Sequence, residues 1–182
     1  AVAREVDAPD RTHVVPADAT DPDDVARLFD EAEKAMGTVD GIVVASGTHE
    51  SLSLGETLHC AAERIAKLSS ALLVGPALVA FEAARRFRSG GAGHIVMISS
   101  HSAVRPLPGD LAYAPMKAGI HALCLNLELE LAETPVKVTE IQPSAINTES
   151  VAEHLVPGDE KQAVQPEQVG DVVVFALSLA EN

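Results

Sequence analysis

Apolar residues in this chain follow two patterns, short continuous runs and helical repeats. The runs at Val39–Ala45, His94–Ile98 and Val136–Ile141 are rich in branched side chains. Such runs are typical of strands that are buried on both faces of a parallel sheet. A shorter run at His13–Ala17 predicts one more strand before them.

Helical spacing dominates between these runs. The first helix is predicted to begin near Thr20 or Asp21 as its cap, with Pro22 in the first turn, and to end at Gly37. Residues 48–60 are expected to form a loop. Three further helices are predicted: about Ala61 to Arg88 with a break near Gly75–Pro76, Tyr113 to about residue 132, and Pro166 to about Leu179.

The segment after Tyr113 carries two conflicting signals. Its leucines alternate from Leu123 to Leu131, which is the period of a strand. Leucine, glutamate and alanine nevertheless favour helix, and the run is long for a strand. We therefore expect a helix that is buried on more than one face.

The order of the predicted elements indicates an α/β fold. Strands that alternate with helices are typical of a doubly wound, Rossmann-like parallel sheet, here as a single domain over residues 1–182. Ligands of such sheets bind beyond the carboxyl ends of the strands. Asp18, Gly47, Ser100 and Pro143 all fall at predicted strand ends, so we expect a site there.

Composition narrows the classes of function. The chain has 47% hydrophobic residues but only four Phe, one Tyr and no Trp, which predicts an aliphatic core. Its net charge of −14 gives it no electrostatic reason to bind nucleic acid or an anionic membrane. No apolar run approaches the ~20 residues of a membrane span. Two cysteines, Cys60 and Cys124, are too few for a disulfide framework and suggest reduced thiols in a cytoplasmic protein.

The candidate chemistry centres on Tyr113, the only tyrosine, and on Lys117. Positions i and i+4 share one face of a helix, so the phenol and the ammonium should lie together. An adjacent ammonium lowers a tyrosine pKa from about 10 and suits it to acid–base chemistry. Tyr-x-x-x-Lys alone is a weak motif. Ser100, thirteen positions upstream, strengthens it because its hydroxyl could hold a substrate oxygen.

With these residues the chain resembles the short-chain dehydrogenase/reductase family over essentially all of its length. Ser100, Tyr113 and Lys117 match the catalytic serine, tyrosine and lysine of the family. The resemblance places the following residues beside a nicotinamide dinucleotide: Asp18, Ala19, Ala45, Ser46, Gly47, Tyr113, Lys117, Pro143, Ser144 and Thr148.

The resemblance implies an NAD(P)-dependent oxidoreductase that transfers a hydride between the nicotinamide and a small-molecule carbonyl or alcohol. Tyr113 would be the general acid or base, Lys117 would lower its pKa and hold the nicotinamide ribose, and Ser100 would orient the substrate oxygen. NADP is slightly favoured over NAD by the similarity of the C-terminal helix. A homodimer or homotetramer is implied through helices 68–88 and 113–132, unless both are simply buried within one domain.

Four departures from the family pattern stand out. No glycine-rich turn opens the chain and a final strand is not evident, so a fragment is expected. Val44-Ala45 stands where two asparagines are common. Leu72 aligns with the family's helical asparagine, and Ser144 replaces a glycine.

Other classes of function remain as alternatives. The chain could be a non-catalytic, dehydrogenase-like scaffold or regulatory protein that binds no dinucleotide. A serine hydrolase is weaker, because Ser100 lacks a Gly-x-Ser-x-Gly elbow. The seven histidines show no metal-ligand spacing. Of these, His101 could line a pocket or lie on an exposed loop, and surface placement is expected for His49.

Overall fold

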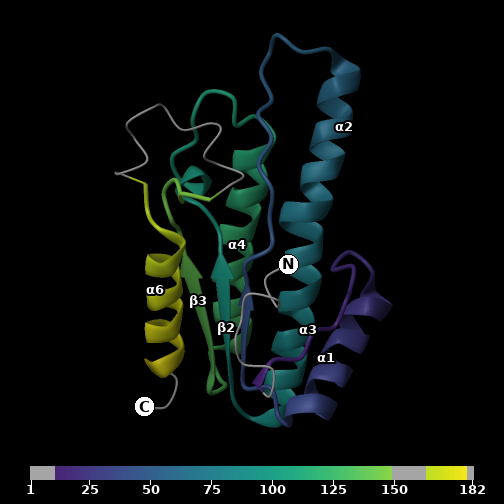
Figure 1. The fold of residues 1–182 in the computed structure, drawn as a ribbon, viewed down its shortest axis with the longest axis vertical. Coiled ribbons are helices and arrows are strands. Elements are labelled where there is room, and N and C mark those ends of the chain that lie inside the picture. The colour runs from purple at the N-terminus through teal and green to yellow at the C-terminus, as the bar shows by residue number, and fades with distance from the viewer. Residues whose placement is uncertain (1–10, 149–162, 180–182) are drawn as a thin grey trace.

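The computed structural model describes residues 11–148 and 163–179. These residues form a parallel sheet of three strands in the order β1-β2-β3. Val44 pairs with Met97, and Ile98 pairs with Ile141. The carboxyl ends of the strands therefore meet at the upper end of the sheet in Figure 1. The strands are β1 (Gly41–Val44), β2 (Gly93–Ile98) and β3 (Val136–Ile141).

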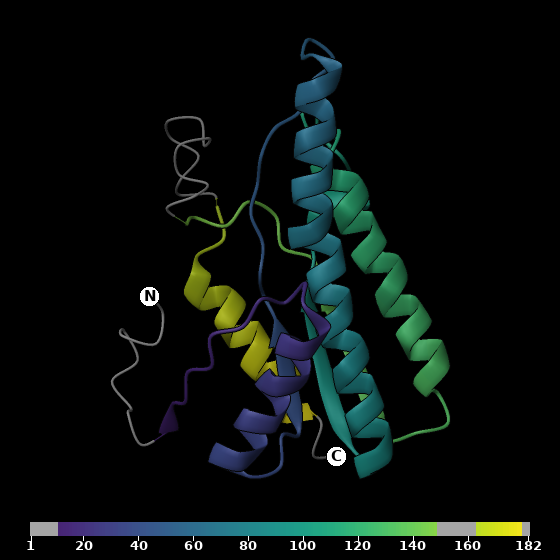
Figure 2. The same ribbon diagram turned by 90° about the vertical axis from the view of Figure 1, so that its right-hand side faces the viewer.

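Helices cover both faces of this sheet. On one face lie α3 and α4, and on the other lies α6 (Figures 1 and 2). A first helix, α1, packs beside α3. This arrangement confirms the predicted Rossmann-like α/β architecture. The bounds are α1 (Pro22–Met36), α2 (Leu58–Ser69), α3 (Gly75–Gly90), α4 (Tyr113–Leu131) and α6 (Pro166–Ser178).

The main core lies between the sheet and the pair α3 and α4. The central strand β2 contributes Ile95 and Met97, which are almost fully buried. Burying aliphatic side chains supplies most of the driving force for such a core. The helices contribute residues at helical spacing: Ala80, Ala83, Ala84, Phe87, Ile120, Cys124, Leu127 and Leu131.

The first helix forms as its sequence predicts. The side chain of Asp21 accepts hydrogen bonds from the amides of Asp23 and Asp24, which are otherwise unsatisfied at a helix start. Gly37 ends the helix with a positive φ of 88°, a conformation that favours glycine.

A cluster of charged side chains fastens α1 to α3. The guanidinium of Arg86 contacts Asp30 at 2.7 Å, Glu33 at 3.1 Å and Glu82 at 2.6 Å. Hydrogen bonds from Arg85 and Arg86 lower the pKa of Glu82 to about 2. Charge-assisted contacts of this kind are stronger than neutral hydrogen bonds.

A π-helical turn, η3 (Ser70–Val74), joins α2 to α3 without interrupting the helix. The break that the sequence predicted near Gly75–Pro76 is therefore a change of helical pitch just before Gly75. A Cβ on Gly75 would lie 3.2 Å from the Cβ of Ala19, so the chain after residue 17 passes close to this point. Single π-turns are frequent at functional sites.

Three local predictions were wrong or incomplete. His13–Ala17 is not a strand, because no described strand pairs with it and a strand depends on such ladder bonds. The predicted loop 48–60 ends early, since Thr57 caps α2 by accepting a hydrogen bond from the amide of Cys60. The helix α4 is buried on one face, whereas Leu125 and Leu129 are 49% and 77% exposed.

One helical segment of the described chain is long and apolar enough to cross a membrane by length and composition. It spans Leu58–Gly90, and 28% of its most apolar window is buried. No apolar run in the sequence had indicated such a segment. Its α3 part packs on the sheet and on α1, and its η3 part packs on α4. Packing in the core of the protein therefore explains why the buried positions of this segment are apolar.

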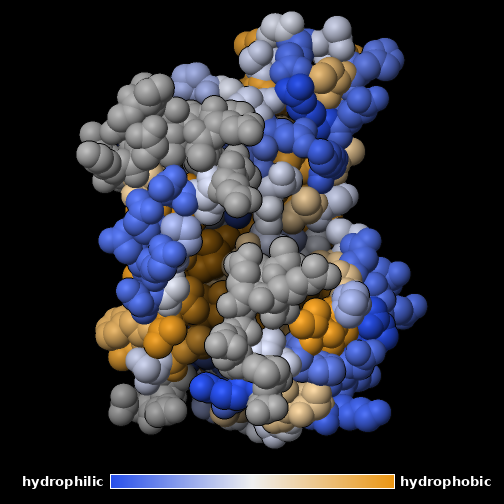
Figure 3. All heavy atoms as spheres, viewed as in Figure 1, coloured by the Kyte–Doolittle hydropathy of each residue, from blue (hydrophilic) through white to orange (hydrophobic). Residues whose placement is uncertain are grey.

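Apolar side chains also gather on the surface of α6. Val172, Val174, Phe175 and Leu179 are between 49% and 67% exposed. Figure 3 shows hydrophobic colouring over the lower part of this helix.

Candidate active site

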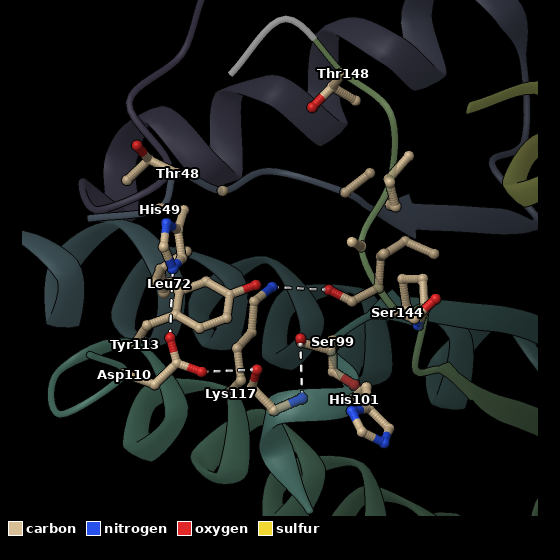
Figure 4. Close-up of a pocket in the computed structure, with 18 of the residues that line it drawn as sticks. Thr48, His49, Leu72, Ser99, His101, Asp110, Tyr113, Lys117, Ser144 and Thr148 are labelled. Atoms are coloured by element: carbon tan, nitrogen blue, oxygen red, sulfur yellow. Dashed lines mark hydrogen bonds and ion pairs between the residues drawn. The ribbon is translucent and has the colours of Figure 1, made fainter. Parts of the chain in front are cut away.

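A cavity of about 450 Å³ lies at the carboxyl ends of the strands. It is lined by nine of the eleven residues that the sequence analysis assigned to catalysis or cofactor binding: Ala45, Ser46, Gly47, Ser100, Tyr113, Lys117, Pro143, Ser144 and Thr148. They come from four separate segments, which only the parallel sheet brings together (Figure 4).

Tyr113 and Lys117 occupy the first turns of α4, as their spacing predicts. The Nζ of Lys117 lies 5.9 Å from the centroid of the Tyr113 ring. It donates a hydrogen bond of 3.2 Å to the carbonyl oxygen of Ile98, the last residue of β2. Lys117 is only 6% exposed, so this contact supplies part of what the ammonium loses with its water.

The electrostatics of this pair differ from the expectation. Burial raises the pKa of Tyr113, the nearby carboxylate of Asp110 adds to the rise, and a hydrogen bond with Ser100 opposes it. Burial also lowers the pKa of Lys117, against the influence of Glu140. Desolvation, which disfavours the charged form of each group, is therefore the main cause of both shifts. The lowering that we expected from Lys117 is not among the causes of the Tyr113 shift.

Ser100 stands where β2 turns into a loop. Its hydroxyl accepts a hydrogen bond of 3.1 Å from the amide of Ser102 and so caps a short 3-10 helix, η4 (His101–Ala103). The amide of His101 donates to the carbonyl oxygen of Pro143 at 2.9 Å. The loop after β2 is thus fastened to the loop after β3, which fixes the catalytic candidate Ser100 beside Tyr113.

A second polar pair in the cavity was not predicted. The carboxylate of Asp110 is buried and accepts hydrogen bonds from the Ser102 hydroxyl at 3.0 Å and from the Leu107 amide at 3.3 Å. It also lies 3.4 Å from Nε2 of His49, whose ring packs edge-on against Tyr113 at 4.8 Å between centroids. His49, expected at the surface, therefore forms a wall of the site.

A weak sequence signal for this pair exists. Asp110 lies three residues before Tyr113, just ahead of the N-terminal end of α4, and the dipole of a helix favours a carboxylate near that end. His49 is 61 positions away from Asp110, and only the fold shows that the two meet.

Gly47 and Leu72 form the floor of the cavity beside Lys117. A Cβ added to Gly47 would lie 3.3 Å from Cδ2 of Leu72 and 3.9 Å from Nζ of Lys117. Glycine therefore keeps space open next to the ammonium. Leu72 is buried at the position where the resemblance implied an asparagine.

Asp18 and Ala19 are not among the residues that line the cavity. The Asp18 carboxylate accepts hydrogen bonds from the amide and the hydroxyl of Thr20, and its pKa is lowered chiefly by the amide contact. The structure thus engages Asp18 in a local turn, and its contact with a cofactor stays a prediction.

The histidine, cysteine and acidic side chains of the described residues form neither a metal site nor a disulfide. No group of three or more His, Cys, Asp or Glu among residues 11–148 and 163–179 is placed to hold a metal ion. Cys60 and Cys124 are not joined in a disulfide, and burial raises the pKa of Cys124 to about 12.

Comparison with known proteins identifies the family. A family model described as enoyl-(acyl carrier protein) reductase, of the short-chain dehydrogenase type, matches residues 1–181. The chain belongs to the short-chain dehydrogenase/reductase family. It is accordingly an oxidoreductase, as the family resemblance implied.

Relatives in this family support the assignment. An uncharacterised oxidoreductase of Staphylococcus aureus (strain N315) is 28% identical over 171 residues, which cover 94% of this chain and 72% of the relative. An uncharacterised oxidoreductase of Mycobacterium tuberculosis (strain CDC 1551 / Oshkosh) is 34% identical over 141 residues, or 76% of this chain and 54% of the relative.

Solved structures of similar fold include short-chain dehydrogenases. The structure described as ElxO with NADP bound has a TM-score of 0.77 at 20% identity, over 87% of this chain and 68% of that one. The closed form of serine dehydrogenase complexed with NADP+ has a TM-score of 0.74 at 20% identity, over 87% and 67%. A short-chain dehydrogenase from Streptomyces avermitilis has a TM-score of 0.69 at 27% identity, over 78% and 51%.

Proposed function

We propose that this protein transfers a hydride between NADP(H) and a small carbonyl or alcohol, with Ser100, Tyr113 and Lys117 as its catalytic residues. The observation that carries the proposal is the convergence of these three side chains on one cavity at the carboxyl ends of the strands. A phenol, an ammonium and a hydroxyl in that arrangement can exchange a proton with a substrate oxygen and hold that oxygen in place.

The described residues fit the nicotinamide side of such a cofactor. Gly47 leaves space beside the Lys117 ammonium that a Cβ would fill, and Pro143, Ser144 and Thr148 line the opposite wall. Lys117 and Tyr113 would hold the ribose hydroxyls. When bound, the nicotinamide supplies or accepts the hydride, and the protein supplies orientation and proton transfer.

Each catalytic residue has a distinct task in this proposal. Ser100 donates a hydrogen bond to the substrate oxygen. Tyr113 gives its phenolic proton to that oxygen during reduction and takes a proton from the hydroxyl during oxidation. Lys117 places a positive charge beside the phenolate that reduction leaves, because its Nζ faces the Tyr113 ring.

The raised pKa of Tyr113 gives the two directions different pH dependences. Reduction needs the protonated phenol, which is the dominant form at neutral pH. Oxidation needs the phenolate, whose population grows about tenfold per pH unit below the pKa. We therefore expect reduction to vary little between pH 6 and 8 and oxidation to accelerate as pH rises.

Hydride transfer by site variants tests the proposal. The full-length protein is assayed with NADPH and with NADH over a panel of aldehydes and ketones, and the two cofactors are compared by kcat/KM. Tyr113→Phe is expected to reduce kcat by about 10²- to 10⁴-fold. Ser100→Ala should also reduce it, whereas the matched variant Ser89→Ala, an exposed serine at the end of α3, should not. Activity retained in Tyr113→Phe would refute the proposed role of Tyr113.

A homodimer or homotetramer belongs to the same proposal. Support comes from large apolar side chains exposed on the two long helices: Phe81 on α3, and Leu125 and Leu129 on α4. Light scattering after size-exclusion chromatography tests it. A single monomeric species at micromolar concentration would contradict it, and Leu129→Glu should weaken any assembly that buries this face.

A further inference from the structure

A buried carboxylate lies behind the catalytic candidates, on the α4 side of β3. Glu140 has a side chain that is only 11% exposed. It accepts hydrogen bonds from the hydroxyl of Ser99, from Nδ1 of His121 at 2.6 Å and from the side-chain amide of Gln142. These donors hold the pKa of Glu140 below its usual value although burial pushes it upward. The group is therefore a fixed negative charge at neutral pH.

This carboxylate is connected to both halves of the proton-transfer site. Ser99 is the residue before Ser100, and its amide donates to the carbonyl oxygen of Ile141 at 2.9 Å. His121 lies one helical turn after Lys117 on the same face of α4. Glu140 thus binds the strand end that carries the serine and faces the helix that carries the lysine.

The buried ammonium of Lys117 has no carboxylate of the described chain in direct contact with it. Within the described residues it makes no ion pair, and its hydrogen bond to Ile98 is to a neutral carbonyl. Burial alone would drive such an ammonium to release its proton. Glu140 is the group that opposes this effect, since its charge raises the pKa of Lys117.

Other groups around Lys117 do not supply this charge. On α4, Tyr113 and His121 lie one turn before and one turn after Lys117. The apolar Leu72 of η3 lines the same cavity. The Asp110 carboxylate is directed to Ser102 and His49, on the far side of the tyrosine. Cys124, further along α4, is neutral because burial raises its pKa to about 12.

We infer that Glu140 is a positioning residue of the active site: through Ser99 and His121 it joins the strand end that carries Ser100 to the helix that carries Lys117, and it places a negative charge on that side of the lysine. The inference rests on the proposed function only in that it takes Lys117 and Ser100 as working residues. By staying out of contact, the carboxylate leaves the Lys117 ammonium available for a ligand in the cavity.

Titration of Lys117 tests the inference without an activity assay. The full chain is labelled with [ε-¹³C]lysine, and the signal of Lys117 among the five lysines is assigned by its loss in Lys117→Arg. Removing a nearby negative charge disfavours the ammonium, so Glu140→Gln should move the titration midpoint of Lys117 to lower pH. The matched control is Glu130→Gln, which changes an exposed glutamate on α4, the helix that carries Lys117. This variant should leave the Lys117 midpoint unchanged. An unchanged midpoint in Glu140→Gln would overturn the inference.

Further variants separate charge from packing. Glu140→Met also removes the charge and fills a similar volume. If circular dichroism shows that Glu140→Gln is unfolded, the titration of Lys117 is measured in Glu140→Met instead. Glu140→Asp keeps the charge, so its Lys117 midpoint should lie closer to that of the parent than the midpoint of either neutral variant does. His121→Gln leaves the carboxylate ionised at alkaline pH and should not move the midpoint; a shift as large as that of Glu140→Gln would assign the effect to His121 instead.

The catalytic consequence is measured in the pH profile of kcat/KM. Because protonated Lys117 is required, the alkaline limb of the reduction profile should move to lower pH in Glu140→Gln, by the same amount as the titration midpoint of Lys117. Glu140→Asp should restore most of the profile. A merely structural role would lower activity equally at all pH values. If Tyr113→Phe stayed active but the Lys117 midpoint shifted, the proposed function would fail while the role of Glu140 stood.

Discussion

Two cations in this protein, the partly buried Arg86 and the buried Lys117, are held in opposite ways. Arg86, between α1 and α3, contacts three carboxylates directly, at distances from 2.6 to 3.1 Å. Lys117, at the carboxyl ends of the strands, contacts a neutral carbonyl and has Glu140 as a counter-charge behind it. Protein oxygens accept hydrogen bonds from most N–H groups of Arg86, whereas Lys117 donates one hydrogen bond within the described chain, to Ile98.

The difference separates a structural cation from a functional one. A guanidinium whose hydrogen bonds are satisfied joins two helices and has little left to offer a ligand. An ammonium that lacks a contacting carboxylate loses stability but can donate to a substrate or cofactor. Perturbed ionisable groups collect at functional sites for this reason, although ionic clusters such as that of Arg86 perturb pKa values as well.

Replacing each cation with methionine should give opposite results, and the largest effect is expected at Lys117. Lys117→Met is expected to lower kcat/KM for carbonyl reduction by about 10³-fold, because the developing phenolate loses its neighbouring charge. Thermal unfolding should be unchanged or shifted upward, since a buried ammonium is replaced by an apolar chain of similar length. A large loss of stability in this variant would contradict the comparison.

Arg86→Met should show the reverse. Removing the guanidinium leaves Glu82, Asp30 and Glu33 close together without their partner, at a cost of about 2 kcal/mol in the free energy of unfolding. Activity of the folded fraction should stay within about twofold of the parent. Urea unfolding and steady-state kinetics on the same preparation measure both quantities.

The open space beside Lys117 gives a third test. Gly47→Ala adds a Cβ 3.9 Å from Nζ of Lys117 and 3.3 Å from Leu72. We expect NADPH binding to weaken about tenfold, because a preformed contact surface is lost. Calorimetry measures the affinity, and Gly55→Ala, a glycine in the loop before α2, is the control. Undiminished affinity in Gly47→Ala would place the cofactor elsewhere.

The smallest effect concerns acid stability around Arg86. Glu82 has a folded pKa of about 2, below its ordinary value of 4.5. Its stabilisation is therefore fully present above pH 4.5 and is lost as pH falls from there toward 2. Glu82→Gln should lower the free energy of unfolding by about 1 kcal/mol at pH 7. The difference from the parent should shrink as the pH approaches 2.

Local sequence spacing predicted part of the geometry of the cavity. Tyr113 and Lys117 are four residues apart on one helix, so their proximity follows from helix geometry alone. The positions of Gly47, Ser100 and Pro143 followed from a general property of parallel sheets, that carboxyl ends share one edge. These inferences need only the identity of the elements, not the details of packing.

The remaining features depend on contacts between distant segments. His49 meets Asp110 across 61 positions, and Glu140 meets His121 and Ser99 only because β3 pairs with β2 beneath α4. The direction of the Tyr113 pKa shift depends on burial, which spacing does not reveal. His13–Ala17 shows the opposite error, since a strand-like sequence needs a neighbouring strand to become one.

The π-helical turn at Ser70–Val74 makes the long helix sensitive to changes in length. Each residue of an α-helix advances the chain by about 100° around the axis. Deleting one residue within this turn would allow a continuous α-helix and rotate α2 by that angle relative to α3. Leu72 would move away from Gly47. Arg64 would lose its hydrogen bond to the carbonyl oxygen of Ser51, which lies two residues after His49 in the same loop. A single-codon deletion here would thus disturb the site more than many substitutions of its lining residues.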